Sequence, residues 1–279
     1  MRSVRPRALL AAPHRRARRF LRRHHNAVLE RVPAAALPRG WTVGPPDFVG
    51  VGAQRCGTSW WYSALEAHPD VQRVPASPKE RHYFDRFWRE PFFTEEAVIG
   101  YHRLFPRAPG RLIGEWTPGY LHSFWAPTLL KRAAPEARIL VMLRDPIDRY
   151  VSAVSSFSNG QRSGQIGLPS DAFQRGLYHQ QLQRVLAQFA RERVLVLQYE
   201  RCRDQPEEEL ERSYAFLGLA DTGFRPPVLA QRVNATRSEK VVLDGDLGQA
   251  LRNGYREDAA KLFDDFPELD PALWATLSL

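Results

Sequence analysis

The sequence predicts an α/β, three-layer, P-loop-like fold with a central, mostly parallel sheet flanked by helices. Three observations support this prediction. From Asp47 onward, apolar β-rich runs alternate with segments of helical period, as in repeated strand–helix units. The run Arg138–Leu143 is apolar without alternation, as expected for a strand buried on both faces. The run Phe48–Val51 leads into a turn bounded by Gly52 and Gly57, the glycine spacing of a P-loop, and then into a helix.

The individual elements follow from local pattern, apolar β-rich runs indicating strands and helical periodicity indicating helices. The expected strands are Phe48–Val51, a short extended piece Val71–Val74, Leu112–Glu115, Arg138–Leu143 and Val194–Gln198. The expected helices are Thr58–Ala67, Glu95–Phe105, Pro127–Ala134, Pro146–Phe157, Asp171–Arg191, Pro206–Leu217 and Leu247–Phe266. These elements make one domain, residues 46–279, preceded by a basic extension and linker, residues 1–45.

The net charge of +9 is concentrated in the N-terminal extension. Residues 1–40 contain eleven arginines and one acidic residue, Glu30, so the rest of the chain is close to neutral. Between Pro13 and Pro33 the apolar residues could line one face of a helix. This pattern allows a helix that lies on a membrane surface, or an arm with only weak helical structure. Weak contact of residues 1–40 with an anionic surface, membrane or nucleic acid, is therefore one hypothesis.

Composition also bears on the compartment. The two cysteines, Cys56 and Cys202, form neither a disulfide framework nor a metal-ligand cluster, which favours a reducing compartment. No apolar run approaches the ~18 residues that cross a bilayer. We therefore expect a cytoplasmic protein without a transmembrane segment, with peripheral membrane contact left open by the basic arm.

Polar motifs follow four of the expected strands. In a parallel sheet the ligand site lies at the carboxyl ends of the strands, so these motifs should meet at one edge. A purely structural α/β domain would not need such motifs at this edge. The four motifs are Gly52–Ser59, Ser77–Asp85, Trp116–Tyr120 and Arg144–Ser152.

The turn after the first strand is built for an anion but differs from a nucleotide triphosphatase loop. A Walker A motif places Lys and then Ser or Thr after its second glycine, whereas this chain has Thr58 and Ser59 there. The cation lies inside the loop, at Arg55. Backbone N–H groups at a helix N-terminus still bind phosphate well. The loop thus favours a nucleotide with a different tail, and a P-loop kinase or a degenerate NTPase loop is the alternative.

Taken in order, the motifs resemble those of sulfotransferases that use 3′-phosphoadenosine 5′-phosphosulfate (PAPS), specifically the heparan sulfate sulfotransferases and their bacterial relatives. The resemblance covers about residues 46–279. Four blocks carry it: Gly52–Ser59, similar to the 5′-phosphosulfate loop; Pro78–Asp85, similar to K-E-x-H-F-F; Glu115–Tyr120, similar to E-K-[ST]-P-x-Y; and Leu143–Ser152, similar to L-R-[DN]-P-x-x-R-x-x-S.

The resemblance implies sulfuryl transfer from PAPS to a hydroxyl or amine of an acceptor that the sequence does not identify: a saccharide, a glycolipid or a small molecule. No metal is required, because there is no β/γ-phosphate to bridge. The implied 5′-phosphosulfate ligands are Gln54, Arg55, Cys56, Gly57, Thr58 and Ser59. Arg55 would also stabilise the charge that develops during transfer.

The second block implies the catalytic groups. Glu80 is the expected general base, and Lys79 and His82 are expected to tune its pKa or to bind an anionic acceptor. His82 is the second candidate for the base, because cytosolic sulfotransferases use a histidine. The alternative for Lys79 and Glu80 is an ordinary solvated ion pair.

The remaining blocks imply the 3′-phosphate site. Arg144 and Ser152 would both face this phosphate, the arginine as a fork of donors. The alternative is that an ion pair, Arg144 with Asp148 or Asp145 with Arg149, caps the helix, and Arg149 is expected to be structural. Arg237 falls where the family has a basic loop over the nucleotide.

Two residues depart from the family pattern, Arg55 and Trp116, where lysine is usual. The aromatic residues near the motifs could form a wall for a flat acceptor or could simply pack in the core. These aromatic residues are Trp60, Trp61, Trp116, Tyr120 and Trp125.

Overall fold

The computed structural model describes residues 37–73, 78–88, 92–158, 168–220, 223–230 and 241–277. Its centre is a parallel sheet of four strands in the order β4-β2-β5-β6. The strands are β2 (Phe48–Gly52), β4 (Gly114–Trp116), β5 (Arg138–Leu143) and β6 (Val194–Gln198). Strands β5 and β6 pair in continuous parallel register from Ile139 with Val194 to Leu143 with Gln198. The predicted fold class is confirmed.

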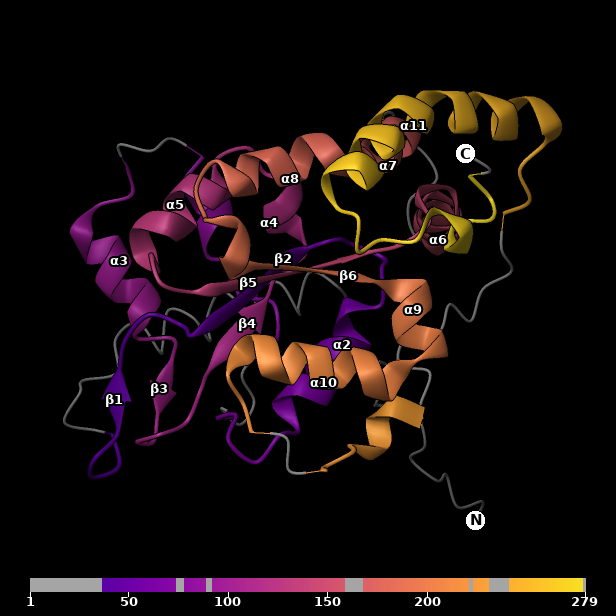
Figure 1. Ribbon diagram of the computed structural model, residues 1–279. Helices are drawn as coiled ribbons and strands as arrows, with labels where there is room; N and C mark the ends of the chain where they lie inside the picture. Colours follow the sequence, from indigo (N-terminus) through magenta and orange to yellow (C-terminus); the bar gives the residue numbers. More distant parts are fainter. Residues whose placement is uncertain are drawn as a thin grey trace, which may run out of the picture.

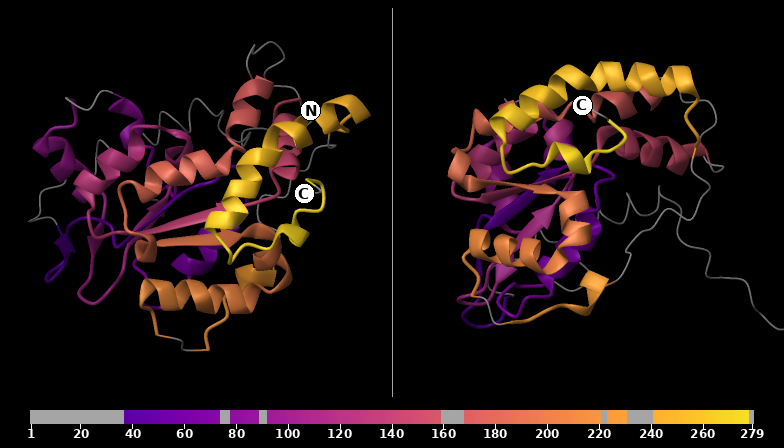
Figure 2. Two further views of the ribbon diagram at one scale, coloured as in Figure 1. Left: turned by 45° about the horizontal axis from the view of Figure 1, so that its top comes forward. Right: turned by 45° about the vertical axis from the view of Figure 1, so that its right-hand side comes forward.

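Helices cover both faces of this sheet, giving three layers (Figures 1 and 2). One face carries α2 (Thr58–Glu66) and α10 (Pro206–Leu217). The other face carries α4 (Gly119–His122), α5 (Ala126–Ala133) and α8 (Tyr178–Leu186). Two helices lie beside the carboxyl ends of the strands that precede them, α6 (Pro146–Ser158) after β5 and α9 (Tyr199–Asp204) after β6.

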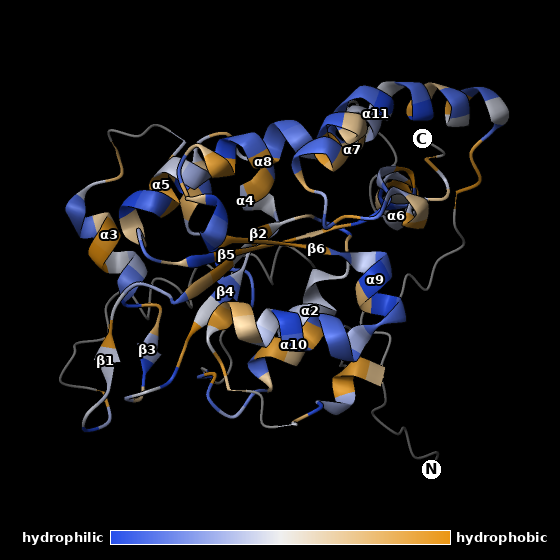
Figure 3. Ribbon diagram, viewed as in Figure 1, coloured by the Kyte–Doolittle hydropathy of each residue, from blue (hydrophilic) through white to orange (hydrophobic). Residues whose placement is uncertain are grey.

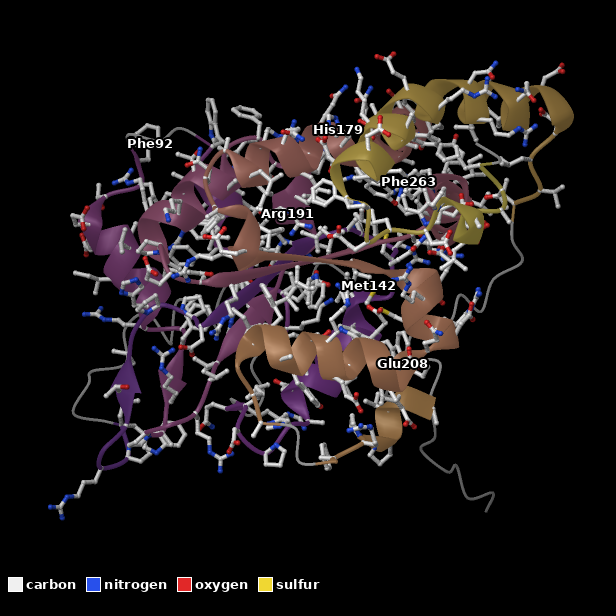
Figure 4. The ribbon with its side chains drawn as sticks, in the orientation of Figure 1. Phe92, Met142, His179, Arg191, Glu208 and Phe263 are labelled. Carbon is white, nitrogen blue, oxygen red and sulfur yellow. The ribbon has the colours of Figure 1, made fainter. Side chains whose placement is uncertain are left out.

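Hydropathy follows these layers. The strands are among the most apolar segments, while the helices turn polar residues outward (Figure 3). The side chain of Met142 on β5 lies between the sheet and α2, and Glu208 is exposed on α10 (Figure 4). Burial on both faces is what a central parallel strand requires, and every residue of β5 after Arg138 is buried.

Several predicted elements differ from the structure. The expected strand at Val71–Val74 is reduced, within the described residues, to one parallel bridge between Val71 and Leu112. The expected linker includes β1 (Thr42–Val43), which pairs with β3 (Pro106–Arg107). Helix α3 (Glu95–His102) ends earlier than expected.

The expected helix Asp171–Arg191 is two helices, α7 (Leu168–Gln174) and α8, followed by a short 3-10 turn η4 (Arg191–Arg193). The break falls at Gly176, whose added Cβ would lie 2.7 Å from the ring of Tyr255. Tyr255 belongs to α11 (Gly245–Asp265) and also donates a hydrogen bond to the carbonyl of Phe173. Packing from a distant helix thus decides where α7 ends.

The C-terminal part packs back on the domain. Helix α11 contacts α8 and α6. Phe263 of α11 packs edge-on against Trp274, with ring centroids 4.9 Å apart (Figure 4). Short 3-10 turns complete the fold: η2 (Phe84–Arg86), η5 (Pro227–Ala230) and η6 (Pro271–Leu273). Within the described residues, no helix combines the length and the apolar character needed to span a membrane.

Candidate active site

The turn between β2 and α2 has the backbone shape of an anion-binding loop. Arg55 and Gly57 both adopt left-handed backbone conformations, with φ of 72° and 84°. Gly57 immediately precedes α2, so its turn directs the chain into the helix N-terminus. The first N–H groups of a helix lack intrahelical acceptors and attract anions. Thr58 and Ser59 add two hydroxyl groups at the same point.

Gly57 is also required by packing. A Cβ at this position would lie 2.7 Å from the ring of Tyr199, the first residue of α9. The same ring contacts the guanidinium of Arg144, whose Cζ lies 5.1 Å from the ring centroid. Tyr199 therefore joins the loop after β2 to the motif after β5, a role that the sequence did not reveal.

The side chain of Arg55 extends from the loop toward α6. Its Nε and Nη2 atoms donate hydrogen bonds to Ser152 Oγ, at 3.1 and 3.0 Å. Arg55 and Ser152 were predicted to bind opposite ends of the nucleotide, yet the structure brings them into contact.

Cys56 points into the core. Its thiol is fully buried and lies 3.7 Å from the hydroxyl of Tyr178. Burial raises the pKa of this thiol to about 11. Cys56 can therefore serve an anion through its backbone N–H, while the Gln54 side chain is exposed to solvent.

Lys79 connects the loop to the second motif. Its ammonium donates hydrogen bonds to Thr58 Oγ1 and Ser59 Oγ, at 3.2 and 3.1 Å. The same Nζ lies 3.5 Å from a carboxylate oxygen of Glu80. The lysine side chain is 16% exposed, so this is not the solvated surface pair that was the alternative interpretation.

Glu80, His82 and Asp85 form a chain of charged groups. His82 Nε2 lies 3.0 Å from Glu80 Oε2, and Nδ1 lies 2.9 Å from Asp85 Oδ2. Burial lowers the pKa of His82, but the bonds to Asp85 and Glu80 outweigh it and raise the pKa to about 9. Near neutral pH the ring is therefore an imidazolium and has no free nitrogen to accept a proton. This geometry favours Glu80 over His82 as the base.

Asp85 had no assigned role in the sequence interpretation, although it stands three residues after His82. A turn at η2 is what brings its carboxylate back to the ring.

A buried carboxylate fixes the segment that carries these groups. Glu115, on β4, accepts hydrogen bonds from the backbone N–H of Arg81 and from the hydroxyls of Thr117 and Tyr101. Burial raises the pKa of Glu115 against the opposing effect of these bonds. The N–H of His82 in turn donates to Thr117 Oγ1 at 3.3 Å. Glu115 thus holds the segment in position.

Arg144 adopts the ion pair that was the alternative reading. Its Nη2 donates to Asp148 Oδ2 at 3.0 Å, one turn along α6. Its buried Nε has no hydrogen-bond partner among the described residues, which leaves a donor for a ligand. Arg237 lies outside the described residues. Arg149, predicted to be structural, is fully buried and donates to the carbonyl of Ala172.

The C-terminal segment supports this motif. Asp145 Oδ2 accepts hydrogen bonds from the N–H groups of Thr276 and Leu277. Glu200 accepts from the N–H of Asp145 and from the indole of Trp274. Burial raises the pKa of Glu200 to about 7. These contacts explain why residues far along the chain bear on the turn after β5.

Most of the site aromatics belong to the core. Trp116 is fully buried against Gly50, where an added Cβ would lie 2.0 Å from the indole. Trp60, Trp61 and Tyr120 are buried as well, and only Trp125 is partly exposed. The packing interpretation is therefore correct for these four, and Trp116 takes no part in an aromatic wall.

Residues 45–249 match the sulfotransferase domain family. Heparan sulfate glucosamine 3-O-sulfotransferase 3B1 of Homo sapiens is 29% identical over 256 residues, covering 78% of this chain and 62% of that protein. Heparan sulfate glucosamine 3-O-sulfotransferase 6 of Homo sapiens is 30% identical over 190 residues, covering 62% and 52%. The chain thus spans only part of the length of these relatives.

Solved sulfotransferase structures are similar to this chain as well. A sulfotransferase from Alicyclobacillus acidocaldarius superposes with a TM-score of 0.66 at 28% identity, covering 84% of this chain and 100% of that one. The sulfotransferase domain from the curacin biosynthetic pathway has a TM-score of 0.53 at 16% identity, covering 79% and 98%, and so shares the fold. With the family match over residues 45–249, these similarities show that the chain belongs to the sulfotransferase domain family.

Proposed function

We propose that residues 46–279 transfer the sulfuryl group of PAPS to a hydroxyl of a saccharide, with Glu80 as the general base. The saccharide is chosen over a glycolipid, a small molecule or an amine because relatives at 29% and 30% identity are glucosamine 3-O-sulfotransferases by name. The acceptor oxygen attacks sulfur, and its proton passes to Glu80. The bond from sulfur to the 5′-phosphate oxygen breaks, and its electron pair stays on adenosine 3′,5′-bisphosphate.

One observation carries the proposal. Lys79 Nζ contacts the Thr58 and Ser59 hydroxyls at the loop and lies 3.5 Å from Glu80. The ammonium of Lys79 thus lies between the candidate base, Glu80, and the loop that would hold the phosphosulfate. In-line transfer needs a base, an acceptor oxygen and the donor aligned at such short range.

The 3′-phosphate is assigned to the turn after β5 and the start of α6. Arg144 offers its buried Nε, and Ser152 stands beside the guanidinium of Arg55. Arginine donors in a fixed fork suit a phosphate. Arg237 remains a proposed ligand from the basic loop.

The function is tested in two parts. Isothermal titration of the full chain with adenosine 3′,5′-bisphosphate should show binding, while ATP with Mg²⁺ should bind far more weakly. Incubation with ³⁵S-labelled PAPS and a panel of oligosaccharides, glycolipids and small metabolites should label a saccharide. Absence of bisphosphate binding, or preferential binding of ATP with Mg²⁺, would overturn the assignment in favour of a kinase or NTPase.

The raised pKa of His82 predicts an alkaline limb in the pH profile of the turnover number, that is, a fall in rate at high pH. Below about pH 9 the imidazolium donates to both Glu80 and Asp85; above it one N–H is lost and Glu80 loses its support. The turnover number should therefore fall as pH rises through about 9. His82→Gln should run roughly 10- to 100-fold slower and lack this limb.

The control is His179→Gln. His179 pairs with Asp265 of α11 at 3.0 Å, so it is a second histidine–carboxylate contact, placed on α8 (Figure 4). This variant should keep both the rate and the limb near pH 9. If the limb persisted in His82→Gln, the fall in rate near pH 9 would come from the titration of another group.

A further inference from the structure

Phe124 is the most exposed aromatic side chain in the described part of the chain, at 68%. It lies in the short connection between α4 and α5, beyond the motif that follows β4. A single apolar side chain in water is common on protein surfaces and needs no explanation by itself. Its surroundings decide whether the ring has a use.

The ring of Phe124 is seated on a second aromatic residue whose orientation is fixed. It packs edge-on against Trp125, with ring centroids 4.9 Å apart. Trp125 is partly exposed, and its indole N–H donates a hydrogen bond to the carbonyl of Phe84 at 3.0 Å. Phe84 is fully buried and begins η2. The aromatic pair is therefore anchored on η2.

The same turn carries charged groups of the candidate active site. Asp85 follows Phe84 and contacts His82, which in turn contacts Glu80. The exposed fraction of these side chains rises from 29% at Glu80 to 37% at His82 and 43% at Asp85. The row of side chains that begins at the candidate base thus opens to solvent toward η2, on which Trp125 is anchored.

The charges along this row do not favour an anionic acceptor. Glu80 and Asp85 are negative, while Lys79 and the imidazolium of His82 are positive near neutral pH, so the four charges cancel. Trp116, where the family pattern has a lysine, is buried and adds no charge. A polyanion is attracted by a surplus of positive charge, which these groups do not supply.

We propose that Phe124 and Trp125 form a stacking subsite for an uncharged sugar ring of the acceptor, next to the ring whose hydroxyl reacts at Glu80. This proposal rests on the proposed sulfuryl transfer to a saccharide. A pyranose presents apolar C–H faces as well as hydroxyl edges, and an aromatic ring packs on such a face. The acceptor is then a neutral oligosaccharide, unlike the polyanion heparan sulfate that is named for the relatives.

The class of acceptor is tested first. The full chain is incubated with ³⁵S-labelled PAPS and neutral hexasaccharides of the common hexoses and N-acetylhexosamines, with a heparin-derived hexasaccharide alongside. A neutral hexasaccharide should be labelled faster than the heparin-derived one. Faster labelling of the heparin-derived hexasaccharide would overturn the proposal.

Variants of Phe124 then test the subsite. With the neutral hexasaccharide that is labelled fastest, Phe124→Ala should raise KM by about 3- to 10-fold, the loss of one aromatic contact. The turnover number should stay unchanged, because a ring away from the reacting bond is bound equally in the ground and transition states. Phe124→Tyr keeps the ring and should retain the wild-type KM. Phe124→Leu keeps an apolar side chain without a flat ring and should raise KM nearly as much as Phe124→Ala.

Ile99→Ala is the matched control, since it removes another exposed apolar side chain, 50% exposed, from α3. It should leave KM unchanged. Far-UV circular dichroism and thermal melting check the fold of each variant. Co-sedimentation with phosphatidylglycerol vesicles tests a membrane surface as the other occupant, and Phe124→Ala should sediment like the wild type.

An unchanged KM in folded Phe124→Ala, an equal rise in Ile99→Ala, or a loss of vesicle binding with KM unchanged would overturn the proposal. Failure of the proposed function looks different: the wild-type chain would bind no adenosine 3′,5′-bisphosphate and label no saccharide. The two failures are therefore distinguishable.

Discussion

Glu80→Gln is expected to lower the turnover number with PAPS by about 10³-fold, within the ~10²–10⁴-fold range of general base catalysis. Glutamine keeps the shape of the side chain and can still accept a hydrogen bond from His82, but it cannot take the acceptor proton. Affinity for adenosine 3′,5′-bisphosphate should change by less than about 3-fold, because in the proposed mechanism Glu80 acts on the acceptor rather than on the nucleotide. Initial rates with ³⁵S-labelled PAPS and titration calorimetry measure the two quantities.

Two further variants make this result specific. Glu208→Gln removes an exposed carboxylate on α10 and should leave transfer unchanged (Figure 4). Asp85→Asn removes the other carboxylate of His82 and should slow transfer less than Glu80→Gln, since Asp85 acts only through the ring. Equal transfer by Glu80→Gln and wild type would remove Glu80 as base. If His82→Gln were then inactive, the histidine would take that role.

The sheet and the positions of its motifs were readable from the sequence because each depends on a short local pattern. The run Arg138–Leu143 is apolar after its first residue, and the structure has the same bounds for β5. Gly52 and Gly57 mark the loop, and α2 begins at Thr58 as predicted. Parallel topology then forces the strand ends together, so the meeting of the motifs followed without knowledge of any side-chain contact.

Side-chain direction was not readable in the same way. The left-handed backbone at Arg55 helps to direct its side chain toward Ser152. Nothing in the local sequence predicts this backbone conformation, because arginine does not favour it. Lys79 meets Thr58 across twenty-one residues, a contact set by the docking of one strand end against another. Such contacts depend on tertiary packing, and a single sequence carries no local signal for them.

Helix breaks and short helices could not be predicted from the sequence for a related reason. Gly176 stands in a segment with a continuous helical period, and it is Tyr255, a distant residue, that fills the space beside it. Helices α4 and α9 have four and six residues, too short for a periodic pattern to appear. The Arg144–Asp148 pair has the i,i+4 spacing common to ion pairs on helices, so spacing alone could not separate it from a ligand site.

Gly57→Ala is expected to weaken binding of adenosine 3′,5′-bisphosphate by about 10²-fold, because two costs coincide at this position. A left-handed backbone costs a non-glycine residue about 1–2 kcal/mol. The new methyl group would also lie 2.7 Å from the ring of Tyr199. Overpacking of this kind costs about 1–3 kcal/mol unless the neighbour moves. If Tyr199 moves, Arg144 loses the ring that it packs on.

Gly110→Ala separates these costs. Gly110 has a similar φ, 73° against 84°, but an added Cβ there has no neighbour within 4 Å. It should lose about 1–2 kcal/mol of unfolding free energy from the backbone alone and bind the bisphosphate like the wild type. Chemical denaturation and calorimetry measure both quantities for both variants. If Gly57→Ala were destabilised only as much as Gly110→Ala and kept its affinity, the loop after β2 would not be the nucleotide cradle. A loss of affinity confined to Gly57→Ala would instead support the loop after β2 as the nucleotide cradle.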